Sequence, residues 1–154
     1  MHDPNQQSNR KALTIQLMEL DEKISYREAQ ELSFAIFQRS AVLNQVFERT
    51  GNPYVHNFLV NIGLKKKGLC YHYSDGLYKY LKQKNYPSFE FHLVGANIGD
   101  YWREHNALVV VAKGQKIMNG IVIDPWRDEQ KLYFSKISED KDYKWKHRIR
   151  RKFY

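Results

Sequence analysis

The spacing of the hydrophobic residues changes once along this chain, near residue 85, and this change constrains the fold more than any other feature. Before it, apolar residues recur every three or four positions, as on one face of a helix. After it, they alternate or run together, as they do in strands. Asn85-Tyr86-Pro87 marks the boundary, because proline disfavours helical geometry in the residue before it. Helices first and antiparallel strands afterwards predict an α+β domain with segregated elements.

Two long helices and one short one are expected before residue 64. Ser25-Tyr26-Arg27-Glu28 has the Ser-x-x-Glu form of a capping box, which begins a helix by satisfying free backbone donors. The helix after it is expected to end at Gly51, and residues 54–62 predict a short helix that ends at Gly63. The apolar stripes, expected to be core, are Leu13, Leu17 and Leu20, then Ala29, Leu32, Ile36, Leu43, Val46 and Phe47.

The segment around the only cysteine predicts a loop followed by a helix. Lys65-Lys66-Lys67 is typical of a basic loop, which leads through Gly68 to Cys70. Helical spacing then resumes, so Cys70 is expected at a helix N-terminus, where free backbone N–H groups favour an anion. The stripe of this helix is Tyr73, Leu77, Tyr80 and Leu81.

Four strands are expected after Pro87, over residues 89–94, 104–112, 120–124 and 131–134, with Pro125 ending the third. Lys113-Gly114-Gln115 is a turn between the second and third strands, which predicts that they pair antiparallel. The start of one strand then lies beside the end of the other. His105 and Asp124 are therefore expected to be neighbours at one edge of the sheet, facing the helix that begins at Cys70.

A chain of 154 residues is the size of one domain, here expected over residues 11–154 after a flexible segment at residues 1–10. No apolar stretch is long enough to cross a bilayer, so no membrane span is expected. The polar start does not resemble a signal peptide, although the chain could begin after one, and the compartment stays open.

The formal net charge of +8 is concentrated near the C-terminus, in residues 144–154. A basic segment with interleaved aromatics could hold nucleic acid or an anionic surface. The alternative is a solvated terminus or a last strand with long basic side chains. No nucleic-acid fold signature accompanies the segment, which favours the second interpretation.

A single cysteine excludes an internal disulfide and is a poor basis for a structural zinc site. A thiolate nucleophile needs a base, usually an imidazole, and a third group that orients the base. His105 as base and Asp124 as orienter satisfy that pattern for Cys70. Each has a plainer interpretation: a buried cysteine, a strand-edge histidine and an aspartate that leaves a strand. The hypothesis rests on all three occurring together, in that order.

Gly68-x-Cys70-x-x-Tyr73-Ser74, followed by Leu77, Leu81 and Pro87, resembles the nucleophile helix of transglutaminase-like cysteine enzymes, within the wider papain-like fold. His105 before an apolar strand and Asp124-Pro125 after another resemble the second and third catalytic segments of that family. The resemblance covers roughly residues 68–127 and implies a papain-like or transglutaminase-like core with a Cys-His-Asp triad.

Two departures from the family pattern bear on the substrate class. Asn106-Ala107 follows the histidine where the family often has a small residue and an aromatic. Met118-Asn119-Gly120 stands where the family tends to place a tryptophan, and Trp126 instead follows Asp124-Pro125.

Several other side chains are weaker candidates. Asn57 and Asn61 could donate to an oxyanion beside the Cys70 backbone N–H, or could cap the short helix. His72 and His92 could join Cys70 and Asp124 around a metal, but a second ligand pair is lacking, so no metal is expected. The aromatics that could wall a substrate groove, or belong to the core, are Tyr71, Tyr101, Trp102 and Trp126.

The sequence therefore predicts a cysteine hydrolase or acyltransferase that forms a Cys70 acyl-enzyme, without a cofactor, on a peptide or protein substrate. Water as second nucleophile gives a peptidase or amidase, and an amine gives a transglutaminase. The alternative is a non-catalytic binding module that uses the same fold and its basic surface to hold a peptide, glycan or nucleic acid. Degenerate members of such folds usually lose the Cys or the His, and this chain keeps both.

Overall fold

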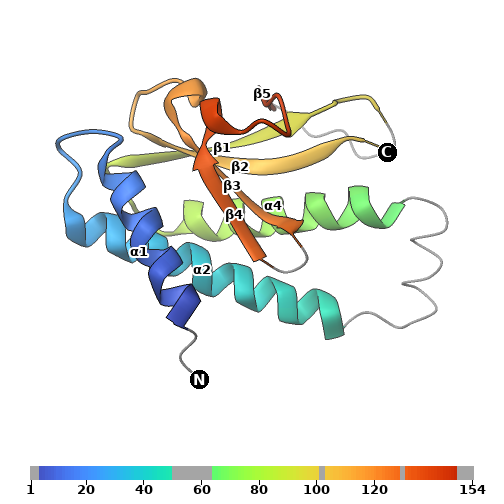
Figure 1. The fold of residues 1–154 in the computed structure, drawn as a ribbon, viewed down its shortest axis with the longest axis horizontal. Helices are drawn as coiled ribbons and strands as arrows, with labels where there is room; N and C mark the ends of the chain where they lie inside the picture. Colours follow the sequence, from blue (N-terminus) through green and yellow to red (C-terminus); the bar gives the residue numbers. More distant parts are fainter. Residues whose placement is uncertain (1–3, 50–63, 101–102, 129–130, 149–154) are drawn as a thin grey trace.

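The computed structural model describes residues 4–49, 64–100, 103–128 and 131–148, and side chains over 6–43, 73–100, 103–125, 127 and 132–148 (Figure 1). Over these residues the chain is α+β, with helices first and an antiparallel sheet afterwards, as predicted. The helices are α1 (Pro4–Met18), α2 (Tyr26–Arg49) and α4 (Leu64–Gln83). The strands are β1 (Phe89–Ala96), β2 (His105–Ala112), β3 (Ile121–Asp128), β4 (Lys131–Lys136) and β5 (Lys146–His147).

The sheet has the order β4-β3-β2-β1-β5, and each neighbouring pair is antiparallel. Its central strand, β2, is buried on both faces, which explains why its apolar residues run together instead of alternating. α4 lies against one face of the sheet, and the segment that carries β5 lies on the other side (Figure 1). The site therefore depends on which face each side chain of β2 and β3 occupies.

Two hydrophobic clusters mark the two faces of the sheet. Leu108, Val110, Ile121 and Ile123 belong to the cluster that also contains α4 side chains. Their alternate neighbours belong to a smaller cluster with Ile137 and Trp145; these neighbours are Ala107, Val109, Val111 and Val122. Because successive strand residues point to opposite faces, this register fixes the faces of His105 on β2 and of Asp124 on β3.

α2 begins where the capping box predicted, since the Ser25 hydroxyl accepts a hydrogen bond from the Glu28 N–H at 3.1 Å. The Glu28 carboxylate does not complete the box. It instead accepts hydrogen bonds from the backbone N–H and the hydroxyl of Ser88, at 2.9 and 2.7 Å. Glu28 thus ties the first turn of α2 to the connection between α4 and β1.

α4 begins six residues before Cys70, so the prediction that Cys70 lies at a helix N-terminus is wrong. The expected basic loop, including Gly68, is part of the helix. Lysine and leucine are good helix formers, and one glycine costs only about 1 kcal/mol, which tertiary packing can offset. The backbone N–H of Cys70 therefore lies in the helix interior rather than among its free N-terminal donors.

Two other boundaries differ from the predictions. α1 begins at Pro4, so residues 4–10, which were expected to belong to a flexible segment, form its first turns. β3 continues past Pro125 to Asp128, with an irregularity in its pairing to β4 between Asp124 and Asp128. An irregular ladder tolerates a proline, because the missing N–H interrupts no regular pairing there. The short helix predicted at residues 54–62 lies outside the described residues. So does Gly51, where the helix after the capping box was expected to end.

Among the residues that the structure describes, no helix is both long and apolar enough to cross a membrane.

Candidate functional site

His105 and Asp124 are in contact, as the strand pairing predicted. His105 is the first residue of β2, and its Nε2 lies 2.6 Å from Oδ2 of Asp124 on β3. Both residues are buried, at 1% and 0% exposure. A hydrogen bond between an imidazole and a carboxylate in this setting fixes the orientation of the ring. The arrangement can orient a general base.

The pair lies on the sheet face opposite α4, which differs from the expectation that it would face this helix. His105 shares its face with Ala107 and Val109, and its ring stacks on Tyr143 with centroids 4.7 Å apart. The described α4 side chains Tyr73 and Leu77 belong to the cluster on the other face. The physical reason is the two-residue repeat of a strand, which places His105 opposite to Leu108 and Val110.

Arg127 connects Asp124 to the segment that follows β4. Its Nε donates to Asp124 Oδ2 at 3.0 Å, and its two terminal nitrogens donate to the Asp140 carboxylate at 3.0 and 2.7 Å. Its guanidinium also lies over the Tyr133 ring, 3.7 Å from the centroid. One oxygen of Asp124 therefore accepts from both His105 and Arg127.

Asp140 is the second carboxylate of this network. Trp145 donates its indole N–H to Asp140 at 2.8 Å. Burial by itself would raise the pKa of the Asp140 carboxyl, but the hydrogen bonds from Arg127 and Trp145 outweigh burial and lower it. Burial alone would likewise lower the pKa of Arg127, but its bonds to Asp140 and the nearby Asp124 raise it.

Arg148 holds a second buried pair beside His105. Its guanidinium donates to Glu104 Oε1 and to Asn106 Oδ1, each at 2.6 Å. The side chains of Arg148 and Glu104 are only 8% and 1% exposed. The prediction of a solvated terminus thus fails for this part of the basic segment, whereas the alternative of a last strand agrees with β5.

The structure does not describe the side chains of the remaining predicted site residues. Cys70, Tyr71 and His72 lie in α4, and Trp126 lies in β3, but their side chains are outside the described part. Asn57, Asn61, Tyr101 and Trp102 lie outside the described residues altogether. The distance between Cys70 and His105 therefore remains a prediction.

Within the described part of the chain, no group of three His, Cys, Asp or Glu side chains could hold a metal ion. His92 packs edge to face on His147, with ring centroids 5.1 Å apart, and its Nε2 lies 3.6 Å from Oε2 of Glu90. Burial, and then the nearby His147, lower the pKa of His92 despite Glu90.

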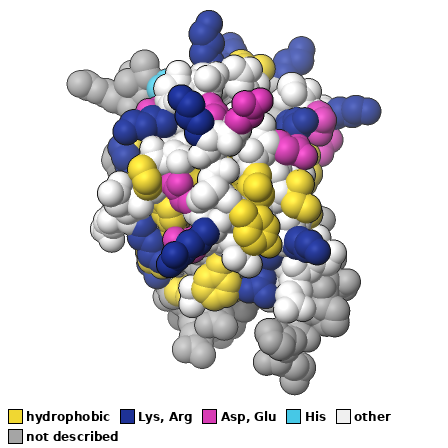
Figure 2. Space-filling view, turned by 90° about the vertical axis from the view of Figure 1, so that its left-hand side faces the viewer, with side chains coloured by type: hydrophobic (Ala, Val, Ile, Leu, Met, Phe, Trp, Pro, Cys, Tyr) yellow, Lys and Arg dark blue, Asp and Glu magenta, His cyan; other side chains and the backbone are white. Residues whose placement is uncertain are grey.

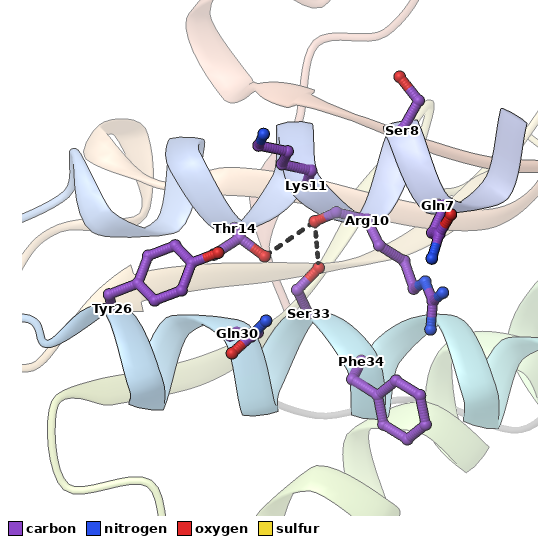
Figure 3. A pocket seen from close by; sticks show the side chains of 9 residues that line it. All are labelled: Gln7, Ser8, Arg10, Lys11, Thr14, Tyr26, Gln30, Ser33 and Phe34. Carbon is purple, nitrogen blue, oxygen red and sulfur yellow. Dashed lines mark hydrogen bonds between the residues drawn. The ribbon is translucent and has the colours of Figure 1, made fainter. Parts of the chain in front are cut away.

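A cavity of about 580 Å³ lies between α1 and α2 (Figure 3). Arg10, Lys11, Tyr26 and Phe34 line it, and the Thr14 and Ser33 hydroxyls both donate to the Arg10 carbonyl, at 2.8 and 2.7 Å. None of the predicted site residues lines this cavity. Figure 2 shows acidic side chains among the basic ones on the face it displays.

Comparisons with protein-family models, with curated proteins and with solved structures return no match for this chain. The resemblance to transglutaminase-like enzymes therefore stays a prediction from the quoted residues.

Sequence reasoning missed the residues that surround the pair, namely Arg127, Asp140, Tyr143, Trp145 and Arg148. The available signal was a cluster of aromatic residues within the charged C-terminal segment, since large aromatics are usually packed. Nothing in the sequence indicated which strand they would cover.

Proposed function

We propose that this chain is a thiol-dependent enzyme for acyl transfer or hydrolysis, with Cys70 as nucleophile, His105 as general base and Asp124 as orienter. The observation that carries the proposal is the buried His105–Asp124 pair at 2.6 Å. An imidazole oriented by a carboxylate is what a nucleophilic thiol requires as its base.

The reaction proceeds in two steps that conserve protons. His105 takes the thiol proton, and the Cys70 thiolate attacks the carbonyl carbon of an amide or thioester. The tetrahedral oxyanion collapses, the bond to the leaving group breaks, and the His105 imidazolium protonates that group. Water or an amine then attacks the acyl-enzyme while His105 accepts its proton, and the bond between the acyl carbon and the Cys70 sulfur breaks. The His105 imidazolium returns the proton to the Cys70 thiolate. Because Nε2 faces Asp124, these transfers pass through Nδ1.

The topology supports a meeting of the two halves of this site at one end of the molecule. The short connection at residues 84–88 brings the start of β1 near the end of α4, and β2 runs antiparallel to β1. The beginning of β2 therefore lies toward the N-terminal half of α4, which contains Cys70 (Figure 1). Since the ring of His105 is on the far face, the thiol must approach it around the end of the sheet.

A second candidate function is a non-catalytic binding module, in which the His105–Asp124 pair only stabilises the sheet. The burial of His105 beneath Tyr143 and Trp145 favours it, as does the sharing of Asp124 with Arg127. The partner of such a module would be a peptide, a glycan or a nucleic acid.

The rate of Cys70 alkylation by iodoacetamide between pH 5 and 9 separates the two functions, and the single cysteine makes every adduct informative. We expect the alkylation rate of wild type to rise at a pH well below the reference thiol pKa of about 8.5. Because Cys70 lies inside α4, a helix N-terminus contributes no activation, so His105→Ala should return the profile to the reference. His92→Ala, a change of the same type on β1, should leave it unchanged. A wild-type profile near the reference, insensitive to His105→Ala, would favour the binding module.

A further inference from the structure

The two residues that flank His105 in the sequence are both held by one side chain from the end of the chain. Arg148 donates to Glu104 and to Asn106, at 2.6 Å each, across 44 and 42 residues of sequence. The three side chains are almost completely buried. A fork of guanidinium N–H groups can bridge two acceptors at once, which a lysine ammonium cannot do with the same geometry.

This bridge lies at the end of the sheet where pairing stops. His105 pairs with Ala96, the last residue of β1, and residues at the end of a ladder open most easily. Arg148 is itself fixed there, because its backbone N–H donates to the Leu93 carbonyl at 2.9 Å and the preceding β5 pairs with β1. The bridge therefore fastens Glu104 and Asn106, on either side of the first residue of β2, to the residue that follows β5.

The neighbouring Gly95 leaves space for this arrangement. A Cβ at Gly95 would lie 3.5 Å from Asn106 Oδ1, the atom that accepts the Arg148 hydrogen bond, and 3.0 Å from Ile98. Gly95 and Asn106 are directly paired across β1 and β2. Asn106 thus occupies the face opposite His105, so Arg148 holds the strand from one side while Tyr143 and Trp145 cover the ring on the other.

We propose that Arg148 is a positioning residue, which holds the Glu104–Asn106 segment so that His105 keeps the orientation that bonds Asp124. A buried arginine with two acceptors is costly to place unless the geometry is good, and removing one partner leaves the other charge unpaired. As a role in catalysis, this inference rests on the proposed function. As a role in orienting the ring, it is measurable without any thiol chemistry.

The experiment uses four variants with two readouts. The first readout is the exchange-protected ring N–H of His105 in proton NMR, which reports the bond to Asp124. The second is the pH profile of Cys70 alkylation. Arg148→Gln removes the bridge, and Glu104→Gln/Arg148→Gln removes it without leaving a buried charge, which protects the test from misfolding. Arg148→Lys keeps the positive charge but lacks the two guanidinium nitrogens that bridge Glu104 and Asn106. Arg103→Gln is the matched control, since the Arg103 side chain is 76% exposed and its guanidinium pairs with Asp100, three residues away.

We expect the His105 ring signal to shift or broaden in the double variant and alkylation at pH 6 to fall by about 10- to 100-fold, the cost of a small misplacement of a catalytic group. Arg148→Lys should recover part of both readouts, and Arg103→Gln should match wild type. A folded double variant with the wild-type ring signal would overturn the inference. A wild-type thiol that does not respond to His105→Ala would instead overturn the proposed function, so the two failures are distinguishable.

Discussion

At the scale of single residues, the described site is a chain of alternating donors and carboxylates. Trp145 and Arg127 donate to Asp140, and Arg127 and His105 meet at Asp124. Asp140 and Asp124 have side chains with 0% exposure, so each negative charge depends on these partners. Removing any one of these hydrogen-bond partners should therefore weaken the stabilisation of the remaining buried charges.

Asp140→Asn tests this dependence. The variant loses the ion pair between Arg127 and Asp140. Its free energy of unfolding at pH 7 should fall by about 3 kcal/mol, the usual cost of breaking a buried pair. The lowered pKa of the Asp140 carboxyl means that its stabilisation is complete above the unfolded value of about 3.9 and is lost as the pH falls through the lower folded value.

Urea unfolding of both proteins between pH 3 and 7 measures this effect. The difference between wild type and variant should be constant above about pH 5 and shrink below about pH 4. Asp142→Asn is the matched control. The Asp142 side chain is 74% exposed, and its Oδ2 makes a long contact of 4.0 Å with Nη1 of Arg127. An equal loss of unfolding free energy in both variants would contradict the role of Asp140. So would a difference between wild type and Asp140→Asn that does not change with pH.

At the scale of elements, the helices and strands were predictable where burial decides the pattern. The stripe residues whose side chains are described, up to Leu43 on α2, lie in the core or, for Leu20 and Tyr80, pack against it, and the apolar run of β2 is buried in the two clusters. The stripe residues Val46 and Phe47 lie outside the described side chains. The helix start at Ser25 was predictable because capping is a local interaction. The start of α4 was not, since Gly68 resembles a helix breaker in sequence and only packing determines whether a helix continues through it.

Glu28 makes a contact between elements that no local rule predicts, and it provides a further test. Glu28→Ala should lower the free energy of unfolding by about 2 kcal/mol, because two hydrogen bonds from Ser88 to a charged acceptor are lost. Glu31→Ala, the control, removes only an exposed pair with Arg27 and should cost at most about 0.5 kcal/mol. Denaturant unfolding measures both, and equal losses would show that the Glu28–Ser88 contact contributes nothing specific.

At the scale of the whole molecule, the sequence predicted the proximity of His105 and Asp124 but not their surroundings. Proximity follows from an antiparallel pair joined by a short turn, which is a local argument. The face of the sheet was mispredicted because it depends on the register of the strand with respect to α4. Arg148 reaches Glu104 across 44 residues, and contacts of such separation leave no periodic signal.

A crystal structure that resolves the side chains of Cys70 and His105 decides whether the two residues act together. We expect the Cys70 sulfur to lie within about 4 Å of His105 Nδ1, at the end of the sheet, with Nε2 bonded to Asp124. A structure in which the thiol lies on the α4 face, with β2 between it and the imidazole, would rule out the triad and give the His105–Asp124 pair a structural role only.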